Sequence, residues 1–246
     1  MATVPELLDF IERERPELDV VAVTEHDTLR AAEEAADLHA RHDYRFELIQ
    51  GVEVTTLDGH LLALFIDRPV PSFRRMEETL EAVHAQGGLA IAAHPLSWLT
   101  RSANKRVLDR IAARGADDGV YFDAIEEFNM SPAGRVSGAR VRALNRDRYG
   151  LAAVGASDAH FLQSIGCAWT EFEGRSPDDL RAAIAAGATR AGSGRHPTIR
   201  ELGYANILRQ SWRGMMATPR NAGWGRTIGS FIVSHRRTPA PPTRRR

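Results

Sequence analysis

LDVVAVTEHDT, at residues 18–28, joins a short apolar run directly to a charged, metal-capable ending. A continuous apolar run of this length is typical of a strand buried on both faces of a parallel sheet. His26 therefore lies just beyond the carboxyl end of the first predicted strand. Buried strands of this kind alternate with helices in α/β proteins, so this stretch predicts that fold class.

The same pattern recurs along the chain. The apolar runs predicted as strands are Leu18–Thr24, Phe46–Thr55, Leu61–Ile66, Leu89–Ala93, Phe122–Phe128, Leu151–Ala156 and Gly166–Phe172. Helical spacing and capping residues predict helices at Val4–Arg15, Ser72–Gln86 and Asp178–Ala186. Strands and helices in this order indicate a distorted (β/α)7 barrel of the TIM type, and barrels of that type usually need about 250 residues.

The composition divides the chain into three parts. Residues 1–195 carry the barrel pattern and end in a glycine-rich stretch, TRAGSGRHP, predicted as a loop. Residues 196–216 are predicted as an amphipathic helix, because apolar residues recur at helical spacing over Thr198–Met216. This helix either packs on the outside of the barrel or binds a partner. Residues 217–246 hold seven arginines and no acid among prolines and glycines, which predicts a disordered basic tail.

The overall composition excludes several protein classes. The 246 residues contain 32 Lys and Arg against 32 Asp and Glu, but residues 101–246 hold 24 of the cations and 13 of the acids. A single cysteine, Cys167, excludes a disulfide framework and a cysteine-based zinc site, so we expect a cytoplasmic protein. No apolar run approaches the roughly 18 residues of a membrane span, and we expect no membrane partner. Contact of the basic tail with nucleic acid is a lesser alternative.

Metal-capable side chains recur just beyond the predicted strands. In β/α barrels the carboxyl ends of the strands form the active-site face, so groups far apart in sequence converge there. Asp58-Gly59 is a hairpin signal that would turn the chain back and bring His60 near Glu53. The convergent set is His26, Glu53, His60, His94, Asp158 and His160.

This set contains four imidazoles, two carboxylates and no thiolate, a combination that suits Zn, Mn or Fe. Six donors exceed what one tetrahedral ion needs, so the sequence predicts a site with two or three divalent metal ions. A multinuclear site can activate a hydroxide as nucleophile and neutralise the charge on a phosphoryl group and its leaving group.

Other polar residues leave alternatives open. Glu25 and Asp27 flank His26 and either orient its imidazole, act as acid or base, or cap the next helix. Arg195 and His196 either bind a phosphate or form an exposed turn, and Arg101 is a comparable candidate. The histidines for which we expect no function are His39, His42 and His84, on the solvated faces of helices, and His235 in the tail.

The motifs resemble those of the PHP family, the polymerase and histidinol phosphatase domain. TEHDT at 24–28 resembles the family's second motif, GVEVTTLDGH at 51–60 its G-x-E…H segment, AAHP at 92–95 its third motif and GASDAH at 155–160 its fourth. The resemblance covers residues 1–195. It implies a seven-stranded distorted barrel, the six residues above as metal ligands with Glu53 bridging, and a compact stand-alone phosphoesterase.

The family pattern opens with a strand that carries H-x-H and then S-D-G, and neither precedes Val4–Arg15 in this chain. We therefore expect the first strand and three ligands to be missing. Met1 would then be an internal methionine, with the native start about 15–25 residues upstream, as one more strand and loop require.

Three functions follow from these patterns. The first is a metal-dependent phosphoesterase acting on a small phosphorylated substrate, a nucleotide or an oligonucleotide. The second is an amidohydrolase-type C–N hydrolase, but many such enzymes bridge their metals with a modified strand lysine, and Lys105, the only lysine, falls in a predicted loop or helix. The third is an inactive, truncated PHP-like scaffold.

Overall fold

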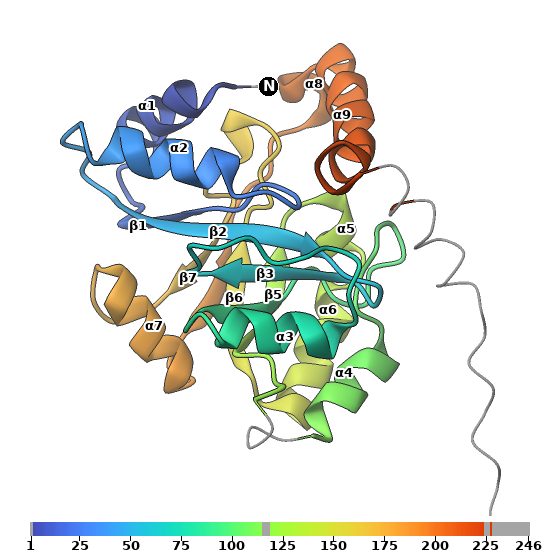
Figure 1. Ribbon diagram of the computed structural model, residues 1–246. Helices are drawn as coiled ribbons and strands as arrows, with labels where there is room; N and C mark the ends of the chain where they lie inside the picture. The colour runs from blue at the N-terminus through green and yellow to red at the C-terminus, as the bar shows by residue number, and fades with distance from the viewer. Residues whose placement is uncertain (1, 115–118, 224–226, 228–246) are drawn as a thin grey trace, which may run out of the picture.

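The computed structural model describes residues 2–114, 119–223 and 227 (Figure 1). The helices are α1 (Val4–Glu14), α2 (Arg30–His39), α3 (Met76–His84), α4 (Lys105–Ala112), α5 (Pro132–Arg135), α6 (Gly138–Leu144), α7 (Pro177–Ala185), α8 (Ile199–Leu202) and α9 (Tyr204–Ala222), with a π-turn at Asn145–Tyr149 and a 3-10 turn at Leu162–Ser164. The strands are β1 (Val20–Val23), β2 (Glu47–Thr55), β3 (His60–Leu64), β4 (Leu89–Ala92), β5 (Ala124–Asn129), β6 (Ala152–Ala156), β7 (Ala168–Glu171) and β8 (Arg190–Ser193).

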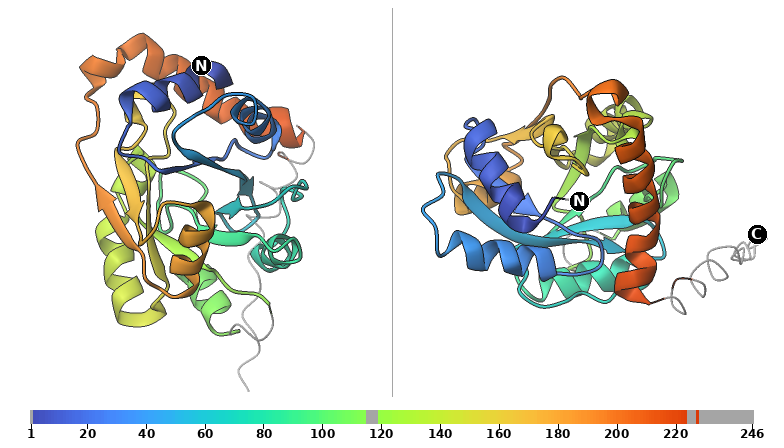
Figure 2. Two further views of the ribbon diagram at one scale, coloured as in Figure 1. Left: turned by 90° about the vertical axis from the view of Figure 1, so that its left-hand side faces the viewer. Right: turned by 90° about the horizontal axis from the view of Figure 1, so that it is seen from above.

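Six strands form one sheet in the order β1-β2-β3-β4-β5-β6, and β7 and β8 form a separate antiparallel ribbon. The ribbon lies against β6, where the Gly155 amide donates to Thr170 Oγ1 at 3.1 Å. The sheet is curled into a half-barrel with helices around its outside, as the view from above shows (Figure 2). The chain therefore has the predicted α/β class, but the described strands make a six-stranded sheet plus a ribbon rather than one continuous seven-stranded ladder.

Each of the seven predicted strands exists, with ends within two residues of the predicted ones. Their pairing is mixed: β1-β2 and β4-β5-β6 are parallel, whereas β2-β3-β4 are antiparallel. The antiparallel part contains the hairpin expected at Asp58-Gly59, but four residues, 56–59, join the two strands instead of two, and Thr55 pairs with His60. The sheet therefore combines the expected parallel strands with an antiparallel segment at the expected hairpin.

The glycine-rich stretch predicted as a loop contains a strand, β8, and this prediction is corrected. Residues 190–193 read RAGS and offer no apolar run, so periodicity could not identify them. The strand pairs through its backbone with β7, and Gly192 lies under the Trp169 ring, where a Cβ would come within 2.5 Å of the indole. The strand therefore forms because its backbone pairs with β7 and because glycine at position 192 leaves space for the Trp169 ring.

Capping fixes two of the helices as predicted. Thr3 and Glu6 form a capping box at the start of α1, and Ser176 and Asp179 form another at the start of α7. Each box satisfies two backbone donors that the first turn of a helix leaves free. The buried faces of these helices, with Leu8 and Ile11 in α1 and Ile184 in α7, pack into the core.

The predicted helix over Thr198–Met216 is two helices, because Gly203 adopts φ +80° between α8 and α9. A left-handed residue ends a helix, and glycine takes that conformation without steric cost. Helix α9 continues to Ala222, so residues 217–222, assigned to a disordered tail, are helical. The rest of the predicted tail lies outside the described residues, apart from residues 223 and 227. None of the described helices has the length and apolarity to cross a membrane.

Candidate metal centre

Glu53 occupies the middle of the candidate site and is only 6% exposed. It lies near the carboxyl end of β2, whose backbone also bonds the loop after β1: the Glu53 amide donates to the Glu25 carbonyl and the Asp27 amide to the Glu53 carbonyl. This isolated parallel bridge fixes His26 beside Glu53. His60 opens β3 and pairs with Thr55, two residues from Glu53 along β2 and therefore on the same face of the sheet, so strand pairing brings both imidazoles near one carboxylate.

Three imidazoles surround this carboxylate. His60 Nδ1 lies 2.8 Å from Glu53 Oε1, His94 Nε2 lies 3.1 Å from the same oxygen, and His26 Nε2 lies 3.5 Å from Oε2. The rings meet edge to face, with centroids 5.1 Å apart for His26 and His60 and 5.3 Å for His60 and His94. The structure thus brings together four of the six residues selected from the sequence.

Two buried nitrogens in this cluster have no hydrogen-bond partner. Nδ1 of His26 and Nδ1 of His60 are both inaccessible to solvent and unsatisfied, and the short His60–Glu53 approach lacks hydrogen-bond geometry. Buried polar groups are rarely left without partners, and metal ligation is one way in which they are satisfied. His26, Glu53 and His60 each offer a ligand atom within 4.8 Å of the others, so these residues fit one divalent metal ion with nitrogen and oxygen ligands.

The electrostatics favour an ionised carboxylate among the imidazoles. Burial opposes ionisation of Glu53, but the charges of His26 and His60 outweigh it and hold the pKa of Glu53 well below its usual value. Burial lowers the pKa of His60. Burial also opposes protonation of His94, but its hydrogen bond to Glu53 and the charge of that carboxylate prevail and raise the pKa of His94 to about 9.

Asp158 and His160 lie beside this cluster rather than against Glu53. His160 Nδ1 is 3.0 Å from the Asp158 carbonyl oxygen and 3.5 Å from its carboxylate. Asn129 connects the pair to the cluster, because its amide donates to Asp158 Oδ2 at 3.4 Å and to Glu126 Oε2 at 2.9 Å. Glu126 in turn accepts the backbone amide of His94.

Glu126, Asn129 and Ser102 belong to this network, although the sequence patterns did not single them out. Burial raises the pKa of Glu126 to about 7. Ser102 Oγ lies 2.9 Å from His94 Nδ1 and orients that ring. A charged residue inside an apolar strand run was the available signal for Glu126, since buried acids are costly and need partners. Asn129 ends β5 and could have been found by the strand-end rule that identified the histidines.

Of the two acids that flank His26, Asp27 has a defined structural role. Its Oδ1 accepts the Thr55 amide at 2.8 Å and the Ser72 hydroxyl at 2.6 Å, while its Oδ2 accepts the Thr55 hydroxyl at 2.8 Å. Asp27 therefore ties the loop that carries His26 to the end of β2. The N-cap residue of α2 is Leu29, so Asp27 is not that cap.

The three cationic candidates are placed differently. Arg101 adjoins the centre: its carbonyl accepts the His60 amide at 3.1 Å, and its guanidinium donates to the Thr56 carbonyl at 3.3 Å. Arg195 forms an exposed ion pair with Glu201 at 2.6 Å. The ring of His196 contacts the neighbouring Pro197 carbonyl at 2.7 Å.

The histidines expected to lack a function are not all on solvated faces. His84 is partly buried and bridges the Gly119 carbonyl and the Asp123 carboxylate, each at 2.9 Å. His39 lies 2.6 Å from the Phe46 carbonyl. Both hold neighbouring segments together, which corrects the expectation for them, and His235 lies outside the described residues.

The backbone is strained at three positions of the site. Asp27, His94 and Asp158 have φ of +57°, +28° and +47°, a region that non-glycine residues rarely adopt. Such strain persists only where the surrounding structure imposes it, and it is often found at functional sites. Each of these residues lies within four residues of the end of a strand: Asp27 after β1, His94 after β4 and Asp158 after β6.

A family model described as PHP-associated matches residues 143–189, the segment that contains Asp158 and His160. An uncharacterized protein of Methanocaldococcus jannaschii is 33% identical over 112 residues, which is 46% of this chain and 58% of that protein. The chain thus spans a little over half the length of this relative.

Solved structures show the same fold at low identity. A two-domain protein from Bacteroides vulgatus that contains a predicted PHP-like metal-dependent phosphoesterase matches 84% of this chain and 64% of its own, with a TM-score of 0.57 and 18% identity. An amidohydrolase from Chromobacterium violaceum, solved with sulfate and no metal, matches 78% of this chain and 92% of its own, with a TM-score of 0.52 and 17% identity. The family model agrees with the PHP resemblance over residues 143–189, and the solved structures show that the fold is shared.

Proposed function

We propose that this chain is a metal-dependent hydrolase that acts on phosphate esters. The observation that supports it best is the buried Glu53 carboxylate within contact distance of three imidazoles, two of which have unsatisfied buried nitrogens. A bound divalent ion supplies Lewis-acid polarisation of a phosphoryl oxygen and a hydroxide nucleophile near neutral pH.

The chain's own residues hold that centre in position. Glu53 keeps a negative charge between His26, His60 and His94, and Ser102 orients the His94 ring. We propose that Asp158 and His160 extend the ligand set, so that all six residues hold two or three ions of Mn, Zn or Fe.

Arg101 would face the phosphate. Its carbonyl accepts the His60 amide and its guanidinium donates to the Thr56 carbonyl, which supports this role, and a guanidinium matches the geometry of phosphate oxygens. We assign the hydrolase to residues 1–195 as a distorted (β/α)7-type unit, followed by the C-terminal helix and the basic tail. Its substrate would be a small phosphorylated compound, a nucleotide or an oligonucleotide.

Metal analysis combined with Mn-dependent hydrolysis of p-nitrophenyl phosphate tests this proposal. Glu53→Gln preserves the shape of the side chain and removes its charge. Loss of a residue that merely orients a ligand costs about 10- to 100-fold in metal affinity, so for Glu53, a candidate ligand itself, we expect at least that loss, and turnover should fall with it. His42→Gln is the matched control, because His42 is exposed and its described side-chain contacts are with the Leu38 carbonyl and the Tyr44 ring, neither of which belongs to the candidate site. Unchanged metal content and turnover in Glu53→Gln would contradict the proposed role, and a metal-free, inactive wild type would favour a scaffold.

Amidohydrolase-type C–N hydrolysis is the second candidate, favoured by the fold shared with the Chromobacterium violaceum amidohydrolase. Lys105 does not support it through a bridging lysine, since it starts α4 and pairs with Asp109 at 2.6 Å. Release of phosphate from histidinol phosphate, a nucleoside bisphosphate and a short RNA should be compared with cleavage of amide substrates by the same metal-loaded protein. Turnover confined to amides would replace the phosphoesterase proposal.

A further inference from the structure

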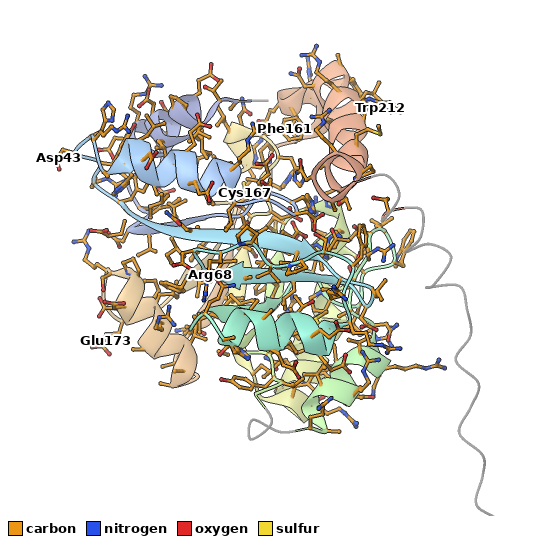
Figure 3. All side chains as sticks on the ribbon, in the orientation of Figure 1. Asp43, Arg68, Phe161, Cys167, Glu173 and Trp212 are labelled. Atoms are coloured by element: carbon orange, nitrogen blue, oxygen red, sulfur yellow. The ribbon has the colours of Figure 1, made fainter. Side chains whose placement is uncertain are left out.

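Two buried polar residues of β5, Glu126 and Asn129, lie between candidate ligands that follow different strands. They are 3% and 4% exposed. β5 is an inner strand of the sheet, between β4 and β6, and side chains surround it (Figure 3). In a regular strand, residues three positions apart point to opposite faces of the sheet. The register of β5 against β6 shifts by one residue between Glu126 and Phe128, however, and an irregularity of this kind re-aims the side chains that follow it.

The register shift brings both polar side chains to one face of the sheet. Glu126 is paired with Val154 and Asn129 with Ala156, and these two residues of β6 are two positions apart. Paired residues of neighbouring strands point to the same face, so Glu126 and Asn129 also share a face. Asn129 Nδ2 accordingly donates to Glu126 Oε2 at 2.9 Å. A regular strand would keep the two side chains apart.

The side-chain amide of Asn129 has a fixed orientation. Its Oδ1 accepts the Ser131 backbone amide at 3.0 Å and the Ser131 hydroxyl at 2.6 Å. A backbone N–H can only donate, so this end of the side chain is the oxygen and the other end is the NH2 group. The NH2 group therefore faces two carboxylates, Glu126 Oε2 and, at 3.4 Å, Asp158 Oδ2. Glycine at position 134 leaves room for this arrangement, because a Cβ there would lie 2.3 Å from the Asn129 Cβ.

Glu126 holds the backbone of His94 beyond the end of a strand. The pairing of β4 with β5 stops at Ala92 and Ile125, so His94 lies two residues past the ladder. Its amide donates to the Glu126 carboxylate instead of to a strand. His94 has φ +28°, a conformation that persists only where the surroundings impose it. A charge-assisted hydrogen bond thus fixes a candidate ligand at a strained position.

We propose that Glu126 and Asn129 are positioning residues that set the separation between two groups of metal ligands. Glu126 fixes His94, which contacts Glu53 in the first group. Asn129 ties Glu126 to Asp158, which belongs to the second group. This inference rests on the proposed function, because it assumes that both groups bind metal. It assigns the two residues a hydrogen-bonding role and no direct contact with the ions.

Glu126→Gln and Glu126→Ala separate this role from a role as ligand or acid-base group. A ligand or acid-base group needs the carboxylate itself, whereas a positioning residue needs only its acceptor oxygen. The Gln oxygen can accept both the His94 amide and the Asn129 NH2 group, and the Ala variant loses both bonds. In calorimetric titration of the metal-free full chain with Mn²⁺, we expect affinity to fall less than about fivefold in Glu126→Gln and about 10- to 100-fold in Glu126→Ala.

Asn129→Ala tests the second half of the bridge, and Asn145→Ala is its matched control. Asn145 is also 4% exposed and donates to a glutamate of β5, Glu127, at 2.8 Å. Its other hydrogen bonds are with the backbone of Leu151, and none of these partners is a candidate ligand. Both variants should lose stability, because each leaves buried polar groups without a partner. We expect Asn129→Ala, but not Asn145→Ala, to weaken Mn²⁺ binding about tenfold.

Hydrogen exchange measured by NMR tests the positioning of His94 without metal. The His94 amide should be protected in the wild type, in Glu126→Gln and in Asn145→Ala. It should exchange at least about tenfold faster in Glu126→Ala, which removes its acceptor. Because Asn145→Ala is also destabilised, it shows how much of any increase comes from lower stability alone.

The results that contradict this inference differ from those that contradict the metal centre. A wild type that binds no Mn²⁺ argues against the proposed function, and His94 exchange then decides the positioning role. Unchanged exchange in Glu126→Ala would overturn that role. So would equal losses of Mn²⁺ affinity in Glu126→Gln and Glu126→Ala, or equal affinities of Asn129→Ala and Asn145→Ala. Circular dichroism checks the folding of each variant, and if Glu126→Ala does not fold, the two asparagine variants decide.

Discussion

Replacing Asp27 tests whether the strained loop after β1 is held by this one carboxylate. Asp27→Ala removes the acceptor of the Thr55 amide, which belongs to a residue only 2% exposed. An unsatisfied buried donor costs about 1–3 kcal/mol. Alanine at φ +57° adds about 1 kcal/mol, because aspartate tolerates this region better. We therefore expect Asp27→Ala to lower the free energy of unfolding by about 2–4 kcal/mol.

Asp27→Asn should be much milder, because its amide keeps an oxygen in the Oδ1 position that accepts both Thr55 N and Ser72 Oγ. The Asn Nδ2 would replace Oδ2, and the Thr55 hydroxyl can accept from it while donating to Thr218. The loss is then limited to the charge on the acceptor, about 1 kcal/mol.

Urea denaturation of the wild type, both variants and Asp67→Ala measures these differences. Asp67 has an 84% exposed side chain, so its replacement should change stability by less than about 0.5 kcal/mol. A 2–4 kcal/mol loss corresponds to roughly 4–16 °C in thermal midpoint for a chain of this size. The reasoning fails if Asp27→Ala is as stable as Asp67→Ala, or if Asp27→Asn is as damaging as Asp27→Ala.

Two further predictions concern the packing of the fold. Burial opposes protonation of His84, but its hydrogen bonds to Asp123 and the Gly119 carbonyl raise its pKa. Protonated His84 therefore contributes fully to the free energy of unfolding below about pH 6.5, and this contribution is lost as the pH rises through the folded-state pKa. His84→Gln should therefore cost more stability at about pH 5.5 than at about pH 9 in urea titrations, and a pH-independent cost would contradict this. Gly155→Ala should destabilise by about 1–3 kcal/mol or more, because a Cβ would lie 2.3 Å from the Trp169 carbonyl oxygen. Gly138→Ala, which meets only a flexible arginine at 3.2 Å and the Glu127 carbonyl oxygen at 3.4 Å, should be neutral in the same thermal melts.

The parts of the fold that were predictable depend on local signals. Apolar runs identified β1 to β7, and the Asp58-Gly59 signal correctly predicted a hairpin that brings His60 near Glu53. The hairpin connection has four residues, 56–59, rather than the two expected, so its exact register was not predictable from that signal. Strand β8 was not predictable, since its RAGS sequence has no apolar run. The strand forms through backbone pairing with β7, and Gly192 has no side chain that would clash with the Trp169 ring. The same holds for the break at Gly203, where one glycine divided an otherwise continuous helical pattern.

The candidate site was predictable where residues follow strands. His26 and His94 follow β1 and β4, so the strand-end rule placed both at one face, and the structure puts both next to Glu53. Glu126 could not be found by that rule because it lies within β5, where its carboxylate accepts the His94 amide from the loop after the neighbouring strand β4. Contacts between strands depend on sheet order, and local periodicity does not contain that information.

The left-handed residues at the site restrict which amino acids can occupy it. Asn, Asp and His are the non-glycine residues found most often at positive φ, and His and Asp are also metal ligands. At His94 and Asp158, the backbone and the chemistry therefore select the same residue types. Alanine at either position would both remove a candidate ligand and disfavour the positive φ. Glycine would remove the ligand but adopt the positive φ without steric cost. Glycine is thus the cleaner replacement for separating the chemical role of these residues from their role in shaping the chain.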